Sequence, residues 1–228
     1  MVGPFPPEPW RLRGDMFVAL WRVPRPDVPG GRLPTGVRPL RLGGSCLMVT
    51  FWVDYRPGGT LAYRELLVAL AVRDRRGPAA CAVGAWVDDE RSLAGGRALW
   101  GIPKELGSFA FGPAPLPSSR SGRAAVRTRM VVERGGRGLD PVVTGLHRDL
   151  LSLPGRLPVR GRLLQPHPVH GRCDVPLRLS GRVRLGRARV QAEPGGPLSF
   201  LDGRRAVLAA SIRGFRMTVG EEGDSPVQ

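Results

Sequence analysis

The chain has 228 residues, a length that fits one domain with a sizeable core. Hydrophobic residues make up 42% and charged residues 24%, which excludes a wholly disordered chain, and the 32 glycines and 24 prolines argue against a helical bundle. No apolar stretch approaches the roughly 18 to 20 residues of a membrane span. The N-terminus also lacks the pattern of a secretory signal. We therefore expect a cytoplasmic protein with no membrane partner.

The formal net charge of +16 raises the question of nucleic-acid binding. Lysine and arginine total 35, and Lys104 is the single lysine, so the other 34 are arginines; asparagine is absent. This bias is typical of a genome rich in G and C, which makes the basic excess partly a coding effect. The arginines are also scattered, with no run longer than a pair. The pattern argues against a nucleic-acid partner.

The first ninety residues predict several strands. Residues 15–23 and 45–54 are apolar runs bounded by proline and glycine turns, as expected of strands. Residues 61–74 fit a helix or a strand by periodicity alone, and the glycine turns around them favour a long strand. Residues 79–89 are apolar on both faces, which predicts a central, buried strand.

One short helix is expected within residues 88–99, followed by a break at Gly101-Ile102-Pro103. Residues 123–133 and 181–191 alternate apolar and polar side chains, which predicts two half-exposed strands.

Residues 112–122 are rich in proline and serine and are interpreted as a loop. Residues 221–228 are polar and are interpreted as a frayed tail, so a single domain is expected over residues 1–220. Together these features predict a mostly β, mainly antiparallel fold, closed or sandwiched, with few helices.

Lys104 stands out because almost every other basic position is an arginine. An arginine guanidinium keeps its proton, whereas a desolvated lysine amine can become neutral and attack a carbonyl. The apolar neighbours Trp100 and Ile102 disfavour an ammonium, and Pro103 restricts the backbone just before the lysine. The segment indicates a nucleophilic lysine; the alternative is a surface lysine that escaped replacement.

The run from Val87 to Lys104 resembles the signature of the acetoacetate decarboxylase family, with an aliphatic-Asp strand end, a Gly-Arg turn and a Pro-Lys pair. Upstream, Tyr63-Arg64-Glu65 resembles the Tyr-x-Glu element of that family. The resemblance covers about the first half of the chain. It implies a cone-shaped, double-layered antiparallel β-barrel with few short helices, often oligomeric, so we expect a homo-oligomer. It also places Lys104 on the imine-forming lysine and Glu65 on a pocket glutamate.

The chain departs from the family pattern at several positions. The second lysine of the family is Glu105 here, so no adjacent cation favours a neutral amine, and a second pocket glutamate falls on Trp52. The arginine that helps to hold the substrate aligns with Gly14, with Arg13 one residue out of register, and the glutamate of the Gly-Arg-Glu turn is Ala98. Four residues are our candidates for substrate binding: Arg13, Trp52, Arg97 and Trp100.

The resemblance implies catalysis through an imine at Lys104. A protonated imine stabilises a carbanion at the neighbouring carbon, whether that carbanion arises by loss of carbon dioxide or of a proton. We therefore expect a cofactor-independent Schiff-base lyase, acting on a small or medium keto acid or an aldehyde by decarboxylation or by aldol condensation and dehydration, in bacterial secondary metabolism. The change to Trp52 indicates a substrate different from that of the decarboxylases.

Glu65 is the expected proton shuttle, or the group that orients an attacking water. The alternative is a buried structural glutamate paired with an arginine. For the whole protein the alternative is a catalytically inert barrel that binds a small carbonyl or apolar ligand, because fold alone does not determine function.

The remaining motifs are weak. His167-x-x-His170-x-x-Cys173 offers three potential zinc ligands in a proline-rich segment, but a structural site usually needs four, so no metal is predicted. The three cysteines are too few and scattered for a disulfide framework. Gly95-Gly96-Arg97 lacks the strand-loop-helix context of a phosphate loop.

Overall fold

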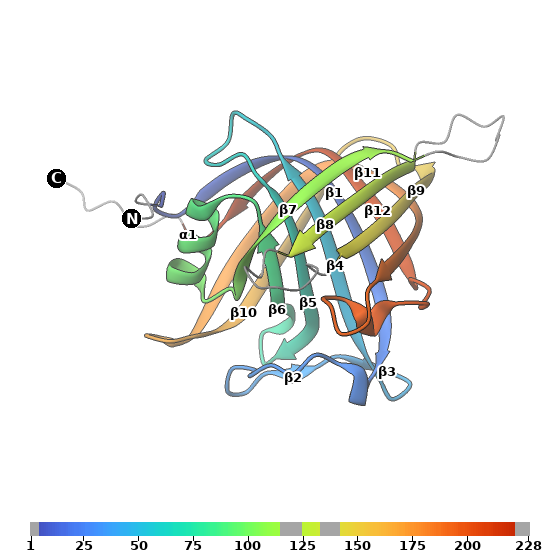
Figure 1. Ribbon diagram of the computed structural model, residues 1–228. Helices are drawn as coiled ribbons and strands as arrows, with labels where there is room; N and C mark the ends of the chain where they lie inside the picture. The colour runs from blue at the N-terminus through green and yellow to red at the C-terminus, as the bar shows by residue number, and fades with distance from the viewer. Residues whose placement is uncertain (1–4, 115–124, 133–141, 222–228) are drawn as a thin grey trace, which may run out of the picture.

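The computed structural model describes residues 5–114, 125–132 and 142–221 (Figure 1). Within these ranges, twelve strands join into one sheet, accompanied by one α-helix, α1 (Glu90–Trp100). The strands are β1 (Trp10–Pro24), β2 (Arg38–Pro39), β3 (Arg41–Leu42), β4 (Ser45–Tyr55), β5 (Arg64–Asp74), β6 (Gly77–Val87), β7 (Lys104–Pro113), β8 (Ala125–Val132), β9 (Val142–Ser152), β10 (Leu157–His167), β11 (Gly171–Ala192) and β12 (Leu208–Val219). No helix in the described part of the chain is long and apolar enough to cross a membrane.

The sheet closes into a ring. In β6 and in β11, one edge of the strand pairs with two different strands along its length. β6 is antiparallel to β5 on one edge, and its other edge pairs with β10 at Ala80 and with β7 at Ala85–Val87. β11 pairs with β12 on one edge, and with β10 and then β9 on the other. The expectation of a mostly β, closed and mainly antiparallel fold is confirmed.

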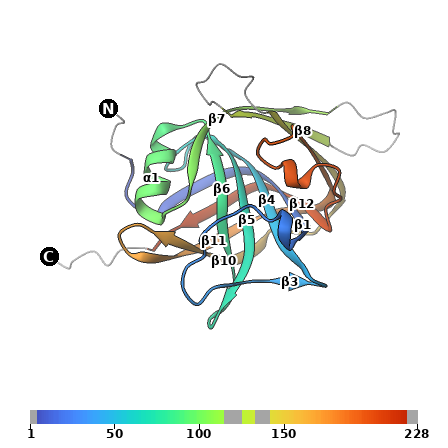
Figure 2. The same cartoon turned by 60° about the horizontal axis from the view of Figure 1, so that its bottom comes forward.

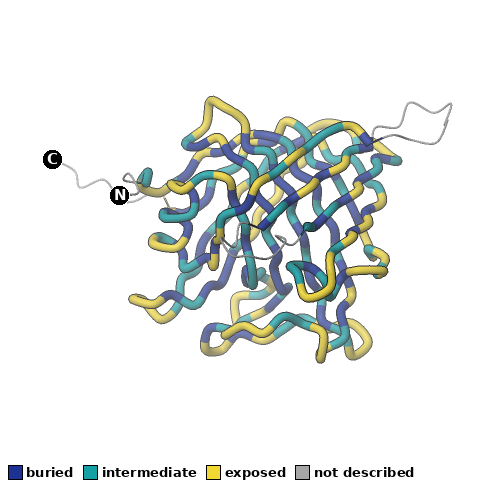
Figure 3. Tube along the Cα trace, in the orientation of Figure 1, coloured by how far each residue is buried: buried dark blue, intermediate teal, exposed yellow. Residues whose placement is uncertain are grey.

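The central strands β12, β1, β4, β5 and β6 each contribute residues to two apolar cores, and buried residues recur along their length (Figure 3). Successive side chains of a strand point to opposite faces. On β4, Val53 and Tyr55 therefore lie in one core, together with Trp100 of α1, while Met48 and Trp52 lie in another. We call these the α1-side core and the η2-side core, the second after a short 3-10 helix, η2 (Ser199–Leu201), on the opposite side of β4, β5 and β6 from α1 (Figure 2).

The helix α1 begins and ends with clear capping contacts. Oδ1 of Asp89, the residue before the helix, accepts a hydrogen bond from the Ser92 amide at 2.8 Å. After the helix, Gly101 has φ 66°, and a Cβ there would lie 2.3 Å from the Pro166 carbonyl oxygen. This turn lets the chain reverse and enter β7 at Lys104.

The strands expected at residues 15–23, 45–54, 61–74 and 79–89 correspond to β1, β4, β5 and β6, and the expected helix to α1. The strand expected at residues 181–191 lies within β11, and strands β2, β3, β7, β9, β10 and β12 were not predicted. Most of the loop expected at 112–122 and nearly all of the expected tail lie outside the described residues, as does part of the strand expected at 123–133.

Candidate active site

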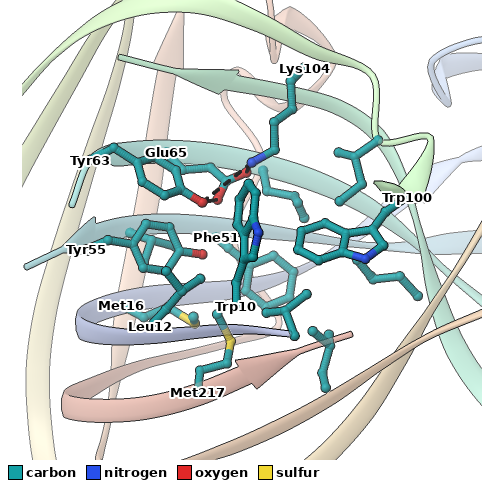
Figure 4. Close-up of a pocket in the computed structure, with 16 residues that line it drawn as sticks. Trp10, Leu12, Met16, Phe51, Tyr55, Tyr63, Glu65, Trp100, Lys104 and Met217 are labelled. Atoms are coloured by element: carbon teal, nitrogen blue, oxygen red, sulfur yellow. Dashed lines mark hydrogen bonds and ion pairs between the residues drawn. The ribbon is translucent and has the colours of Figure 1, made fainter. Parts of the chain in front are cut away.

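A cavity of about 100 Å³ lies in the α1-side core (Figure 4). Leucine, valine, methionine and aromatic side chains supply most of its described lining. Its polar side chains, apart from the two tryptophan N–H groups, are Tyr55, Tyr63, Glu65 and Lys104. The site is therefore a small apolar chamber in which a few polar groups gather at one end.

Lys104 is the first residue of β7, and its side chain is 2% exposed. Its Nζ lies 3.1 Å from Oε1 of Glu65 and donates a hydrogen bond to Oγ of Ser92 at 2.9 Å. The hydroxyl of Tyr63 lies 3.5 Å from the same nitrogen and 3.3 Å from Oε2 of Glu65. One amine, one carboxylate and two hydroxyls thus share a buried cluster.

Each group of the cluster comes from a different part of the chain. Glu65 lies near the start of β5, directly opposite Val53 of β4, and Tyr63 precedes it by two residues, so both side chains point to the same face. Ser92 lies in the first turn of α1, where the Asp89 cap holds its backbone. Closure of the ring brings β7 and Lys104 to the same point.

Two glycines inside α1 make room for the cluster. A Cβ at Gly96 would lie 2.6 Å from Cε of Lys104, and a Cβ at Gly95 would lie 2.5 Å from the ring of Trp10. Glycine inside a helix costs about 1 kcal/mol relative to alanine. At these positions it permits the close approach of the lysine and the indole. Arg97 adds a hydrogen bond from Nε to the Lys104 carbonyl oxygen at 2.7 Å.

Burial controls the electrostatics of this site. Desolvation raises the pKa of Tyr55 and of Tyr63 well above the ordinary value, and the nearby Glu65 carboxylate raises both further. Both phenols therefore stay protonated and serve as hydrogen-bond donors. Nζ of Lys104 also lies 5.2 Å from the Tyr63 ring centroid and 5.8 Å from that of Trp10, within the range of cation–π attraction.

Of the residues predicted from the sequence, Lys104, Glu65 and Trp100 line the cavity, and Trp52 does not. Trp52 follows Phe51 on β4 and points into the η2-side core, where its ring lies 6.4 Å from Phe109. The reason is strand alternation: Phe51 faces the cavity, so its neighbour faces away. Trp52, which the sequence predicted to bind substrate, therefore lies on the opposite face of β4 from this cavity.

The two predicted arginines also lie outside the cavity lining. Arg13 is exposed, and its Nε donates to the Pro57 carbonyl oxygen at 2.6 Å. Arg97 supports the Lys104 backbone from α1. Glu105 points away from the amine, as its position next to Lys104 on a strand requires, and accepts a hydrogen bond from Nε1 of Trp86.

Ser92, Tyr55 and Trp10 belong to the site and were not predicted. The acidic residue three positions before Ser92 is typical of a helix start, but it does not indicate that the Ser92 side chain reaches Lys104. Tyr55 and Trp10 lie on strands whose inward faces depend on register, and no local pattern identifies them.

The histidine motif has a structural role in this fold. Nδ1 of His167 accepts hydrogen bonds from the amides of Val169 and His170, and Nε2 lies 3.0 Å from the Ala98 carbonyl oxygen. His167 thereby connects the end of β10 to α1. No group of three histidine, cysteine or acidic residues in the described ranges is arranged to hold a metal ion.

The acetoacetate decarboxylase family model matches residues 3–151, which is more than half of the chain. The chain belongs to the acetoacetate decarboxylase family. The family resemblance seen in the sequence is thus confirmed. A search of curated protein sequences gave no significant match.

Solved structures show the same fold over nearly the whole length. The enduracididine biosynthesis enzyme MppR, complexed with pyruvate, is 19% identical with a TM-score of 0.62, covering 94% of this chain and 89% of that one. Acetoacetate decarboxylase from Legionella pneumophila is 16% identical with a TM-score of 0.61, covering 96% and 88%. An acetoacetate decarboxylase-like enzyme from Sphingomonas wittichii is 16% identical with a TM-score of 0.57, covering 93% and 91%.

Proposed function

We propose that this protein is a cofactor-independent carbon–carbon lyase that binds its carbonyl substrate covalently, as an imine at Lys104. The observation that supports this most directly is the position of the single lysine: its amine is buried, faces an apolar cavity and lies 3.1 Å from a carboxylate. Membership of the acetoacetate decarboxylase family supports the lyase class.

Glu65 has the geometry to activate the amine. Glu65 lies close enough to accept a proton from Nζ, and this transfer leaves a neutral amine beside a neutral acid. The nitrogen then adds to the carbonyl carbon, and the proton that it releases goes to the carbonyl oxygen. A second proton, from Glu65, lets that oxygen leave as water and leaves a protonated imine paired with the carboxylate.

The same groups can carry the next step. Breaking a bond to the carbon beside the imine leaves an enamine, which is then protonated or attacks an aldehyde. Glu65 faces this position and can supply or accept the proton, with Tyr63 hydrogen-bonded to it. The sequence indicates keto acids as substrates, and MppR is named as an enzyme of enduracididine biosynthesis with pyruvate bound. We extend the proposal to a homo-oligomeric enzyme of secondary metabolism.

Borohydride trapping tests the imine. The protein is incubated with acetoacetate, pyruvate and small ketones, reduced, and analysed by intact mass and peptide mapping. The proposal expects an adduct on Lys104 that depends on the carbonyl compound. The only other primary amine of the chain as printed is the N-terminus. Lys104→Arg keeps a cation beside Glu65 and serves as the matched control, which should give no adduct.

A lack of any adduct in wild-type protein, at neutral pH and with every carbonyl compound, would overturn the proposal. The alternative would then be a binding protein in which Lys104 and Glu65 form a permanent ion pair. Loss of carbon dioxide before trapping would appear in the adduct mass, which separates decarboxylation from condensation.

A further inference from the structure

The cavity lining carries one positive and one negative side chain, so its charges are balanced before any substrate binds. Within the described lining, Lys104 is the only cation and Glu65 the only carboxylate, and they lie 3.1 Å apart. Arg13 and Arg97, the arginines predicted to bind substrate, do not line the chamber, and each donates a hydrogen bond to a backbone carbonyl oxygen. A substrate carboxylate would therefore enter without a cation of its own.

The hydrogen-bond donors of the described lining, apart from the Tyr55 hydroxyl, are also occupied. Nε1 of Trp10 donates to the Pro6 carbonyl oxygen at 2.9 Å, and Nε1 of Trp100 donates to Oε2 of Glu8 at 2.9 Å. The Tyr63 hydroxyl donates to Glu65. A buried carboxylate needs a cation or several donors to replace its hydration. The described lining leaves it neither.

Aromatic rings surround the amine and add to this selectivity. The faces of Trp10 and Tyr63 lie close to Nζ, and the Tyr55 ring packs on Tyr63 with centroids 4.5 Å apart (Figure 4). The face of an aromatic ring carries negative charge, which attracts a cation and repels an anion. This arrangement stabilises the ammonium or the protonated imine and disfavours a second carboxylate beside Glu65.

Imine formation does not remove the difficulty. The protonated imine carries one positive charge, and Glu65 already balances it. A carboxylate on the bound substrate would leave one negative charge uncompensated in a chamber lined by leucine, valine and methionine. An alkyl group in the same position would instead contact those side chains favourably.

The volume of the chamber favours a small substrate. A protein cavity of about 150 Å³ holds benzene. By proportion, the 100 Å³ chamber holds about four non-hydrogen atoms, and because the pocket is open on one side a slightly larger molecule can extend out of it. Small aliphatic carbonyl compounds fall in this range.

We propose that the substrate carbonyl that reacts at this site belongs to a small uncharged aliphatic ketone or aldehyde, and that the cavity selects against keto acids. The inference rests on the proposed imine at Lys104, and it replaces the keto acids that the family resemblance implies with uncharged carbonyl compounds. The expected substrates are uncharged carbonyl compounds that serve as the donor or the acceptor in an aldol reaction. Such a reaction needs no site for a carboxylate and releases no carbon dioxide.

Pairs of compounds with the same shape and different charge test the inference. Glyoxylate is compared with isobutyraldehyde, and pyruvate with methyl isopropyl ketone; in each pair two methyl groups replace the two carboxylate oxygens. The rate of borohydride trapping on Lys104 is measured for each compound. It is divided by the rate for N-acetyl-lysine amide under the same conditions, which corrects for the reactivity of the carbonyl.

The expected result is a corrected rate at least about tenfold higher for the uncharged member of each pair, equivalent to about 1.4 kcal/mol. Equal rates, or faster trapping of the acids, would overturn the selectivity while leaving the imine in place. No trapping of any compound would instead overturn the proposed function, so the two failures are distinguishable.

Two variants sharpen the result by changing the charge balance. Glu65→Gln removes the anion that repels a second carboxylate, so the ratio of acid to uncharged trapping should rise. Met217→Arg places a cation in the half-buried part of the lining and should raise the ratio further, with Met217→Gln as the uncharged control. A ratio that stays constant in Glu65→Gln would contradict the charge argument even if Met217→Arg fails to fold.

Discussion

The two faces of the central strands differ in what they bury. On the η2-side, Trp21, Met48, Trp52 and Leu66 are each fully buried and belong to one continuous apolar core. On the α1-side, the same strands bury Glu65 and leave a chamber beside it. One sheet can therefore carry an apolar core on one face and reactive groups on the other, because alternate residues of a strand belong to different environments.

Polar groups on the two faces also differ in their partners. On the α1-side, the amine of Lys104 contacts Glu65, Ser92 and Tyr63. On the η2-side, Nε1 of Trp52 and Nε2 of His147 are buried and have no hydrogen-bond partner within the described structure. The α1-side thus gathers its polar cluster beside a chamber, whereas the η2-side, which also has paired polar groups such as Trp21 and Thr50, leaves isolated polar atoms within close packing.

The largest effect on the polar cluster of the α1-side is expected when the Lys104 amine is removed. Lys104→Met should abolish carbonyl trapping and lower the free energy of unfolding by about 3 to 5 kcal/mol, because Glu65 is left buried without its partner. Urea denaturation and trapping measure the two effects. The double variant Lys104→Met/Glu65→Gln should regain much of the stability and none of the trapping; additive losses would show that the pair is not coupled.

A methyl group at Gly96 should test how far reactivity depends on the position of the Lys104 side chain, because the amine itself is kept. Gly96→Ala forces the Lys104 side chain to move, since the new Cβ would lie 2.6 Å from Cε. Trapping should fall by about tenfold, equivalent to about 1.4 kcal/mol, although alanine is the better helix former. Ala98→Gly, which loosens an exposed position of the same helix, is the matched control and should trap at nearly the wild-type rate.

The η2-side should respond to acid rather than to substrate. Burial, with a smaller contribution from Arg213, lowers the pKa of His147 from 6.5 to about 3. The unfolded state therefore takes up this proton first as the pH falls below 6.5, and stability decreases. We expect a loss of about 2 kcal/mol by pH 5 from this group.

Urea denaturation of wild type and of His147→Gln at pH 7 and pH 5 measures this contribution. If the free energy of unfolding fell by the same amount between the two pH values in both proteins, the assignment to His147 would be contradicted. The acid cluster at Asp74 does not interfere at pH 5. Arg162 and Arg172 hold the pKa of Asp74 below its ordinary value of 3.8, so its contribution is lost only at lower pH.

The smallest effect is expected at Trp52. Trp52→Phe keeps an aromatic ring against Phe109 and Phe111 and removes the unpartnered Nε1. The change in unfolding free energy should stay within about 1 kcal/mol, and the trapping rate should not change. A large loss of trapping with intact stability would return Trp52 to the substrate site.

The sequence indicates the fold well where strands are apolar on both faces or end at glycine and proline turns, as at β4, β5 and β6. It fails at β10, where Pro158, Gly161 and Pro166 interrupt the pattern and the first five residues are exposed. Strand pairing with β11 along its whole length, a long-range effect, determines this element.

The candidate site was predictable where it depends on residue type and motif. Lys104 is conspicuous in an arginine-rich chain, and Glu65 follows from the Tyr-x-Glu element. Trp52 could not be assigned in the same way, because its face depends on strand register and a shift of one residue reverses it. Ser92 required knowledge of how α1 packs on the start of β7.

Trp10 and Trp100 are perpendicular neighbours in the lining, with ring centroids 4.7 Å apart and an interplanar angle of 68°. Two indoles at this separation couple their electronic transitions, so they form a built-in optical probe of the chamber. A molecule that enters and tilts either ring changes the near-ultraviolet circular dichroism without any attached label. The substitutions Trp21→Phe, Trp52→Phe and Trp86→Phe would remove the contributions of the other tryptophans to the spectrum and leave the signal of the Trp10–Trp100 pair in place.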